Sequence, residues 1–373
     1  MIFLLSPDKF KGSLSAIDAC IAIKKGLSGH NPDIKVVLHP LADGGEGSLA
    51  VLENYLSGEI IIKEVSDPLG KKIKAGYLLD NENAYIELAS ASGLVLLEKE
   101  KQNPLFTSTY GTGEIILDAI NKGAKNIFLF VGGSSTNDAG MGILKALGYK
   151  FMDKYDRELY PSGQNLIKVK FIDNTSLRYD PNKISFYVLS DVENRLAGKK
   201  GAAYVYAKQK GASKSEIEFL DKGLRNFSEI VRNKTGVDIS IIEGGGAAGG
   251  VPAGMCGLAG AVIKSGIDFI IDVTEFKQHL KETDYVVTGE GKLDKQSLQG
   301  KVVGRVAQLA NEFNKPLILF VGINELPDSD LEKLNPYYID TIISHSASID
   351  DAMKNSAEYL KYIAINMMKN LNF

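Results

Sequence analysis

The chain has 373 residues, of which 44% are hydrophobic, and its formal net charge is −3 at pH 7. This length corresponds to about two domains with a sizeable buried core. Because the charge is nearly balanced and shows no strong run of one sign, a nucleic-acid partner and a polybasic membrane patch are both disfavoured.

The first apolar run, IFLL at residues 2–5, has no basic segment before it. It indicates a buried strand rather than a signal peptide. No stretch approaches the roughly 18 consecutive apolar residues of a membrane-spanning helix. The two cysteines, Cys20 and Cys256, form no CxxC pair and no disulfide framework, which suits a reducing compartment. We therefore expect a cytoplasmic protein that contacts no membrane.

Short apolar runs alternate with segments of helical periodicity at both ends of the chain. The expected strands and helices, in order, are 2–5, 13–27, 36–38 and 47–56 near the N-terminus, and 285–288, 300–313, 316–322, 341–344 and 351–371 near the C-terminus. This alternation favours a parallel sheet with right-handed crossovers.

The middle of the chain has a different pattern. Residues 59–89 contain several strand-like pieces separated by the turn signals DPLG and DNEN, and residues 184–191 and 201–212 are again strand-like. We therefore expect an α/β protein of two domains. Residues 1–65 and 281–373 would form a parallel sheet from both chain ends, and residues 66–280 a second, mixed α/β domain.

Polar residues and glycines gather where the apolar runs end, which is where open α/β sheets bind ligands. In the first such loop, residues 6–13, Asp8 can bind a metal or polarise a hydroxyl, and Lys9 or Lys11 can reach a phosphate or a carboxylate. Ser13 suits a helix N-terminus that favours an anion. The alternative is that Ser13 is an ordinary helix cap and the lysines are exposed.

The second loop, ADGGEGS at residues 42–48, places Asp43 and Glu46 on either side of two glycines. Such a pair suits Mg²⁺, which takes a few carboxylates together with water and substrate oxygens. The alternative is a tight turn in which the aspartate caps a helix.

The third loop, VGGSSTNDAGMG at residues 131–142, lacks the spacing of a Walker loop. Gly132 and Gly133 permit close approach of a phosphate, and Ser134, Ser135 and Thr136 offer hydroxyls beside backbone amides that could form an anion site. Asn137 and Asp138 could orient a substrate or a metal-bound water. The alternative is a strand-to-helix turn capped by Asp138.

Three later loops complete the pattern. Asp191 ends an apolar run and suits a general base or a metal ligand. Gln209 and Lys210 could bind substrate or form a solvated turn. Gly245 and Gly246, in the run EGGGAAGG, could cradle a nucleotide phosphate, and a packing contact or a hinge explains them equally well.

The last loop, at residues 286–301, would cluster Glu290, Asp294 and Gln296, and its lysines Lys292 and Lys301 could bind phosphates. A surface loop with two capping acids is the alternative. Together the six loops predict a site for a polyanionic substrate with Mg²⁺ in a cleft between two domains. The sequence has no Ser-His-Asp order of the kind that marks a catalytic triad. It also has no GxGxxG motif in the expected place, so a nicotinamide enzyme is disfavoured.

The same stretches resemble the bacterial type I glycerate kinases. The matching motifs are SPDKFKGSLSA, LADGGEGS, SDPLGKKIKA, IELASASGL, TSTYGTGEII, GGSSTNDAGMG, SDVEN, QKGA, GGGAAGG and TGEGKLDKQSLQGK. The resemblance covers essentially the whole chain. It departs from the usual family pattern at Lys9, where a small residue is common, so the family's lysine role is carried only to Lys11. Further departures are Ser135, where alanine is common, Arg195 and Lys208, where proline is usual, and Lys292, where arginine is usual.

The resemblance implies two α/β domains, one of them Rossmann-like, with the active site in the cleft between them. It also implies transfer of the γ-phosphoryl group of ATP to D-glycerate with Mg²⁺, with 2-phosphoglycerate favoured over 3-phosphoglycerate. The expected partners are therefore small molecules, and a homodimer is left open.

Phosphoryl transfer needs positioning, charge neutralisation and a group that accepts the hydroxyl proton. We expect Asp191 to be the base, with Asp8 as the second choice, and Lys11 to bind the glycerate carboxylate or a phosphate. The carboxylates of Asp43, Glu46 and Glu290 would hold Mg²⁺ or the glycerate hydroxyls. A related kinase for another hydroxy acid or polyol, a non-catalytic regulator and a hydrolase are the alternatives.

Overall fold

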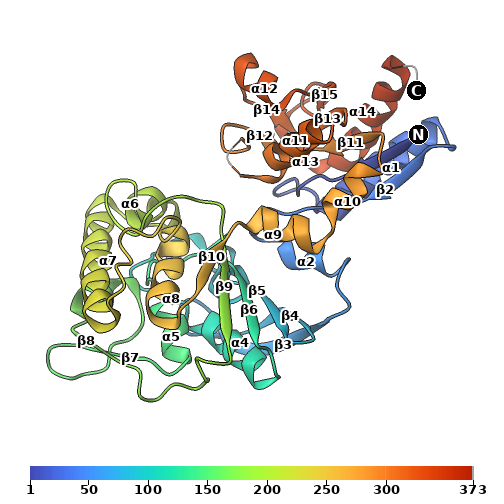
Figure 1. The fold of residues 1–373 in the computed structure, drawn as a ribbon. Coiled ribbons are helices and arrows are strands. Elements are labelled where there is room, and N and C mark those ends of the chain that lie inside the picture. Colours follow the sequence, from blue (N-terminus) through green and yellow to red (C-terminus); the bar gives the residue numbers. More distant parts are fainter. Residues whose placement is uncertain (299, 372–373) are drawn as a thin grey trace. The chain divides into compact units, whose positions relative to one another are not determined.

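The computed structural model describes residues 1–298 and 300–371 (Figure 1). The chain divides into two compact units. Unit 1 consists of Met1–Asp43, Ala50–Tyr55 and Gly266–Phe373, and unit 2 of Gly44–Leu49 and Leu56–Ser265. Each unit combines helices with a sheet that is wholly or partly parallel, so the predicted α/β class is confirmed.

Unit 1 is built from both ends of the chain. Its elements are β1 (Ile2–Leu5), α1 (Ala16–His30), β2 (Lys35–Leu38), α9 (Gly266–Val273), α10 (Phe276–Lys281), β11 (Tyr285–Thr288), β12 (Lys292–Leu293), α11 (Val302–Glu312), β13 (Leu317–Val321), β14 (Ile323–Asn324), α12 (Asp328–Leu334), β15 (Tyr338–Thr341), α13 (Ile349–Lys354) and α14 (Ser356–Asn370). The short helix α2 (Ser48–Leu52) crosses the division between the units at Leu49 and Ala50.

The main sheet of unit 1 has five parallel strands in the order β15-β13-β11-β1-β2. Leu4 of β1 lies between Val286 of β11 and Val37 of β2, so the N-terminal strand is an inner strand of the sheet. The inner strands β13, β11 and β1 are largely buried, as expected for parallel strands covered on both faces, which explains why their sequences are almost wholly apolar. Their carboxyl ends meet at one edge of the sheet, and this edge carries the polar loops of the unit.

Helices α1 and α14 pack against each other in unit 1. The α1 helix begins after Ser15, whose Oγ accepts a hydrogen bond from the amide of Asp18 at 3.1 Å. Ile23 and Leu27, one helical turn apart, are buried in the core. A Cβ at Gly26 would lie 2.4 Å from the carbonyl oxygen of Lys361, so only glycine permits this close approach of the two helices.

The C-terminal segment differs from its prediction. A single helix was expected over 351–371, but the structure has two helices that are separated at Asn355, where φ is −113° and ψ is 22°. Ser348 begins the first of them, because its Oγ accepts a hydrogen bond from the amide of Asp351 at 3.1 Å. The apolar periodicity continues through both helices and therefore hides the break.

Unit 2 holds the middle of the chain. Its elements are β3 (Glu59–Ser66), β4 (Lys72–Asp80), β5 (Asn83–Glu87), α3 (Ala89–Ser92), η1 (Leu94–Leu96), η2 (Lys99–Lys101), α4 (Tyr110–Asn121), β6 (Asn126–Phe130), α5 (Met141–Ala146), β7 (Lys150–Met152), η3 (Gly163–Lys168), β8 (Phe171–Asp173), β9 (Ser185–Leu189), α6 (Ala202–Tyr206), η4 (Lys208–Lys210), α7 (Lys214–Thr235), η5 (Ala247–Gly249), α8 (Val251–Ala259) and β10 (Val262–Lys264).

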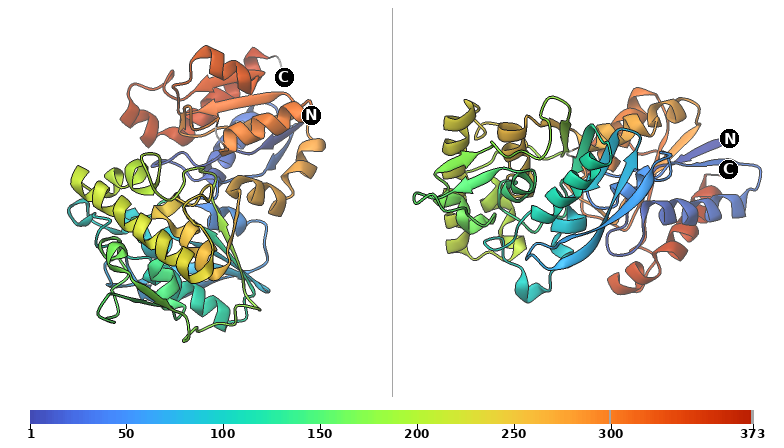
Figure 2. Two further views of the ribbon diagram at one scale, coloured as in Figure 1. Left: turned by 60° about the vertical axis from the view of Figure 1, so that its left-hand side comes forward. Right: turned by 90° about the horizontal axis from the view of Figure 1, so that it is seen from below.

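The main sheet of unit 2 is mixed, in the order β10-β9-β6-β5-β4-β3. Strands β3, β4 and β5 form an antiparallel meander, and β5, β6, β9 and β10 are parallel (Figure 2). The predicted turn DPLG joins β3 to β4. Oδ1 of Asp67 accepts hydrogen bonds from the amides of Leu69 and Lys71, both at 2.8 Å, and Gly70 has a φ of +89°. The parallel half again brings the ends of several strands to one edge.

Residues 201–212 were expected to be strand-like, and this prediction is wrong. They form α6 and η4, with amides of Val205 and Ala207 each donating to the carbonyl oxygen four residues earlier at 3.0 Å. The small side chains Ala202 and Ala203 are buried, whereas Tyr204 and Val205 are exposed. Two buried residues followed by two exposed residues are typical of a helix, whereas burial alternates from residue to residue in a strand.

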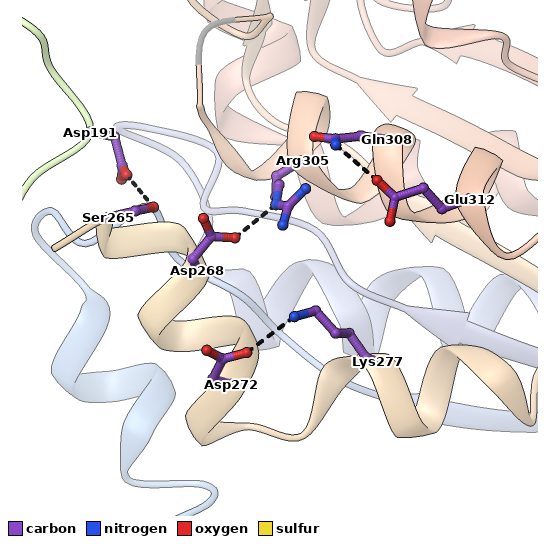
Figure 3. Close-up of polar contacts among 8 residues, drawn as sticks. All are labelled: Asp191, Ser265, Asp268, Asp272, Lys277, Arg305, Gln308 and Glu312. Carbon is purple, nitrogen blue, oxygen red and sulfur yellow. Dashed lines mark hydrogen bonds and ion pairs between the residues drawn. The ribbon is translucent and has the colours of Figure 1, made fainter.

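The division between the units differs from the predicted boundaries at 65/66 and 280/281. Residues 44–49 and 56–65, which were predicted in the first domain, belong to unit 2. Within the second of these segments, β3 pairs with β4 along its whole length. Residues 266–280 belong to unit 1, where Arg305 Nε of α11 donates to Asp268 Oδ1 of α9 at 2.7 Å (Figure 3). The segments 56–65 and 266–280 lack a composition change that would mark the boundary.

Candidate active site

Three loops of unit 1 meet where β1, β2 and β11 end. The amide of Asp8 donates to the carbonyl oxygen of Gly289 at 2.9 Å, and the amide of Leu41 donates to that of Pro7 at 3.2 Å. This backbone pairing brings Asp8 into electrostatic range of Asp43 and Glu290. Three predicted site carboxylates, from sequence positions up to 282 residues apart, therefore belong to one cluster, which we call the carboxylate cluster.

Burial and mutual repulsion make the carboxylate cluster unfavourable when it is fully ionised. Burial and the neighbouring carboxylates of Asp43 and Glu290 together raise the pKa of Asp8 to about 8, against a hydrogen bond from the Lys9 amide. Burial also raises the pKa of Glu290 to about 7, although a hydrogen bond from Ser297 and the charge of Lys301 oppose the shift. Oε1 of Glu290 is buried and has no hydrogen-bond partner among the described residues.

Lys11 and Ser13 of the first loop lie in different surroundings. The Lys11 side chain is exposed. The predicted role of Ser13 as part of a helix N-terminus is wrong, because α1 begins three residues later and Ser15 is its cap. Ser13 Oγ instead donates to the carbonyl oxygen of Met353 at 2.6 Å and lies 2.5 Å from Ser356 Oγ, which joins this loop to α13 and α14.

The loop after β11 carries the remaining predicted residues of unit 1. Lys292 Nζ pairs with Glu325 at 2.6 Å, and both side chains are about half exposed. Asp294 Oδ1 accepts a hydrogen bond from the amide of Gln296 at 2.8 Å, as a capping acid would. Gln296 is exposed and accepts a hydrogen bond from Lys301 Nζ at 3.3 Å.

In unit 2, residues 44–49 lie against the loop at 131–138. A Cβ at Gly132 would lie only 2.6 Å from Cα of Gly45, so the two backbones touch. Glu87, at the end of β5, holds the first of these loops: its Oε1 accepts hydrogen bonds from the amides of Gly47 and Leu49, both at 2.9 Å. The predicted metal ligand Glu46 is exposed in this loop. Sequence reasoning did not single out Glu87, although it lies in the motif IELASASGL.

The loop at 131–142 uses much of its polarity to hold itself in shape. Asp138 is completely buried and accepts hydrogen bonds from Thr109 Oγ1 and the amide of Thr109 at 2.8 Å, and from the amides of Gly140 and Gly142 at 3.2 Å. Burial raises the pKa of Asp138, which these four hydrogen bonds oppose. These contacts agree with the alternative of a strand-to-helix turn capped by Asp138, because the protein itself supplies the hydrogen bonds to its carboxylate.

Lys210 lies beneath the same loop. Its Nζ donates to Ser134 Oγ and to the carbonyl oxygen of Thr136, both at 2.7 Å. The side chain is 3% exposed, so the predicted alternative of a solvated turn fits its neighbour Gln209, which is exposed, but not Lys210. Burial lowers the pKa of Lys210 to about 7, opposed by the negative charge of Asp138.

Two residues of this loop keep unused polar atoms. Ser135 Oγ donates to the carbonyl oxygen of Ser92 at 2.9 Å, so this hydroxyl is engaged. In contrast, Thr136 Oγ1 and both Oδ1 and Nδ2 of Asn137 are buried without a hydrogen-bond partner in the part of the chain that the structure describes. Such atoms are rare in folded proteins and indicate a missing partner.

The glycine run packs against the backbone of this loop. A Cβ at Gly249 would lie 2.2 Å from the carbonyl oxygen of Thr136, and the amide of Ala139 donates to the carbonyl oxygen of Gly249 at 3.0 Å. A Cβ at Gly246 would lie 2.3 Å from the carbonyl oxygen of Arg195. A Cβ at Gly245 would approach the carbonyl oxygen of Ile242 to 2.9 Å. These contacts support the packing interpretation of the run.

Asp191 follows β9, the strand beside β6 in the sheet. Its Oδ1 accepts a hydrogen bond from Ser265 Oγ at 2.7 Å (Figure 3). Ser265 is the last residue of unit 2 before the chain returns to unit 1. Sequence reasoning missed this serine, which lies in no motif and approaches Asp191 only because β9 and β10 are paired.

Over residues 1–298 and 300–371, no group of three or more His, Cys, Asp or Glu side chains is arranged to hold a metal ion. The predicted ligands are also divided: Asp43 and Glu290 belong to unit 1 and Glu46 to unit 2. Among the helices that are described, none is long and apolar enough to cross a membrane.

A sequence model of the glycerate kinase family matches residues 3–372 of this chain. The chain belongs to the glycerate kinase family. A glycerate kinase of Haemophilus influenzae is 38% identical over 378 residues, covering 100% of this chain and 99% of that protein. The glycerate 2-kinase of Escherichia coli is 37% identical over 376 residues, covering 100% and 98%.

A solved structure resembles this glycerate kinase family member over its full length. It is the crystal structure of a Salmonella typhimurium LT2 protein that is described as a glycerate kinase 2, with a TM-score of 0.85 and 35% identity. The match covers 100% of this chain and 98% of that chain. The family resemblance that the motifs predicted is therefore confirmed.

Proposed function

We propose that this chain is an ATP-dependent glycerate kinase that transfers the γ-phosphoryl group of ATP to D-glycerate, giving 2-phosphoglycerate and ADP. The observation that carries the proposal is the family match over residues 3–372, with relatives such as the E. coli glycerate 2-kinase that align over nearly their whole length. The geometry agrees with this chemistry, since buried carboxylates follow the strands of unit 1 and the buried Lys210 contacts the loop after β6 in unit 2.

Catalysis of phosphoryl transfer consists mainly of positioning and charge neutralisation. In unit 1, Asp43 and Glu290 would hold Mg²⁺, and the buried, unpartnered Oε1 of Glu290 fits a cation. Mg²⁺ commonly takes only one or two carboxylates together with substrate phosphates, so a complete three-residue site is not required. When bound, it would neutralise phosphate charge. Glu46 remains a proposed further ligand.

The proton acceptor is proposed to be Asp191, with Asp8 as the second choice. Ser265 would orient the Asp191 carboxylate through its hydrogen bond of 2.7 Å. Lys11 and Lys292, both exposed, would neutralise the substrate carboxylate or phosphates of ATP. The loop at 131–138 would hold either glycerate or triphosphate oxygens.

The decisive experiment is product analysis by ³¹P NMR after incubation with ATP, Mg²⁺ and D-glycerate. We expect 2-phosphoglycerate and an equal amount of ADP. Another hydroxy acid or polyol as the best acceptor in a coupled ADP assay would indicate a related kinase. Phosphate release without an acceptor would indicate a hydrolase, and nucleotide binding without ADP formation a regulator.

The base assignment has its own test. We expect Asp191→Asn to lower kcat by about 100-fold or more, because general bases contribute roughly 10²–10⁴-fold. Asp180→Asn, at an exposed position of unit 2, is the control. Near-normal kcat in Asp191→Asn would remove Asp191 from this role and leave Asp8→Asn as the next variant to measure.

A further inference from the structure

The unpartnered atoms of the loop at 131–138 distinguish between the two ligands that it could bind. The side chains of Ser134, Ser135 and Asp138 are engaged by Lys210, Ser92 and the Thr109 region. The atoms left over are Thr136 Oγ1 and both polar atoms of the Asn137 amide. A ligand of this loop must therefore satisfy one hydroxyl, one amide donor and one amide acceptor.

The Asn137 amide needs a partner that both accepts and donates hydrogen bonds. Triphosphate oxygens at neutral pH are acceptors, so they could pair with Nδ2 but would leave Oδ1 unsatisfied. A hydroxy acid offers both kinds of group close together, because its carboxylate accepts and its hydroxyl donates. An adenine edge also offers both, but it carries no negative charge.

The charge beneath the loop decides between a hydroxy acid and adenine. Lys210 is buried and donates to Ser134 Oγ and to the carbonyl oxygen of Thr136. Among the described residues no ion pair joins Lys210 to a carboxylate, although the negative charge of Asp138 acts on its pKa. A buried cation without a direct counterion favours an anion bound close to the loop that it contacts. A carboxylate meets this need and adenine does not.

We infer that Asn137 and Thr136 recognise the hydroxy-acid end of glycerate, with Asn137 Nδ2 and Thr136 Oγ1 donating to its carboxylate and Asn137 Oδ1 accepting from a hydroxyl. Lys210 is a positioning residue that holds the loop from below and supplies positive charge. This inference rests on the proposed function, and it assigns the loop to glycerate rather than to ATP. Because these atoms are buried, the segments that cover them must open for the ligand to enter.

Steady-state kinetics of Asn137→Ala, Asn137→Asp and Thr136→Val test the inference. We expect the KM for D-glycerate to rise about tenfold or more, since each variant removes a hydrogen bond to a charged group, while the KM for ATP is unchanged. Asn137→Asp keeps the size of the side chain and so guards against misfolding. Ser135→Ala is the matched control, because its hydroxyl is engaged by Ser92 and does not face the ligand.

Competitive inhibitors test the acceptor atom Oδ1 separately. Propanoate has no hydroxyl, whereas D-lactate and 3-hydroxypropanoate each keep one. We expect at least one of the two hydroxy acids to inhibit the wild type more strongly than propanoate, and Asn137→Ala to abolish this difference. An equal difference in both proteins would show that Asn137 does not accept the hydroxyl, and would overturn the inference.

Two kinetic results would also overturn it. A raised KM for ATP with an unchanged KM for D-glycerate would assign the loop to the nucleotide. Unchanged values for both would mean that the unpartnered atoms hold buried water instead. Calorimetric titration with D-glycerate separates this inference from the proposed function. If the wild-type protein binds D-glycerate but forms no ADP, the proposed kinase activity is refuted. The affinities of the variants for D-glycerate then still test whether Asn137 and Thr136 bind it.

Discussion

At the scale of single residues, burial changes what the predicted site residues do. Asp138 and Lys210 were both predicted to bind substrate or nucleotide, but their polar atoms hold the loop at 131–142 in shape. A buried polar group must find partners in the protein or in a ligand. The residues that find partners within the protein are therefore supports, and those that do not, such as Asn137, are the better candidates for ligand contact.

Lys210 should make stability depend on pH. Its pKa is about 7 in the folded protein and has the ordinary lysine value of 10.5 in the unfolded chain, so the unfolded chain binds more protons between these values. The free energy of unfolding should therefore rise with pH from about 7 to 10.5, by a few kcal/mol, because each pKa unit corresponds to about 1.4 kcal/mol. Urea unfolding at several pH values measures it.

The variant Lys210→Met isolates this contribution. It should remove the rise above pH 7 relative to the wild type, whereas Lys208→Met, at an exposed neighbouring position, should keep it. Parallel pH profiles for the wild type and Lys210→Met would contradict the prediction.

The carboxylate cluster should respond to Mg²⁺. We expect Mg²⁺ to raise the Tm of the wild type, because it relieves the repulsion of buried carboxylates that shifts the pKa of Asp8 and Glu290 upward. Glu290→Gln should weaken this effect and should stabilise the protein when Mg²⁺ is absent. Differential scanning fluorimetry with Glu325→Gln as an exposed control would detect both. An identical Mg²⁺ response in Glu290→Gln would exclude it as a ligand.

At the scale of elements, backbone contacts shape the loops. The glycine run places Gly249 against the carbonyl oxygen of Thr136, and Gly132 meets Gly45. These glycines are needed because a side chain would separate two backbones that must touch. The same composition would suit a phosphate cradle, so composition alone does not distinguish the two.

Two glycines with similar backbone angles separate packing from backbone strain. Gly249 has a φ of +72° and would clash as alanine, whereas Gly236 has a φ of +79° and no atom within 4 Å of its Cβ position. We expect Gly236→Ala to cost about 1 kcal/mol of unfolding free energy from strain alone. Gly249→Ala should cost roughly 1–3 kcal/mol more. Equal losses in urea unfolding would show that Gly249 is not closely packed.

At the scale of the whole molecule, unit 1 is assembled from segments at both ends of the chain, whereas most of unit 2 is one continuous segment. Unit 1 needs β1 and β2 from the N-terminal segment and β11, β13 and β15 from the C-terminal segment to complete its sheet. The main sheet and core of unit 2 come from residues 56–265. The two parts should therefore differ in their ability to fold from a single segment.

We expect a fragment of residues 56–265 to unfold in one cooperative transition, because it contains all six strands of its sheet. A fragment of residues 266–373 should not, because its sheet lacks β1 and β2 and its helix α14 lacks α1. Circular dichroism during thermal unfolding measures both. Cooperative unfolding of the second fragment, or its absence in the first, would contradict this.

The sequence by itself determined the α/β class, the family and most of the strands of the parallel sheets, because short apolar runs and glycine-rich motifs are local signals. It left open the function of each polar residue. Asp8, Asp43 and Glu290 meet only because parallel strands bring their carboxyl ends together. Asn137 and Asp138 lie in the motif VGGSSTNDAGMG, and Lys210 contacts it from elsewhere in the chain. Their roles depend on which of their polar atoms find hydrogen-bond partners in the folded protein. Tertiary structure decided these points, because burial and hydrogen bonding depend on contacts between distant segments.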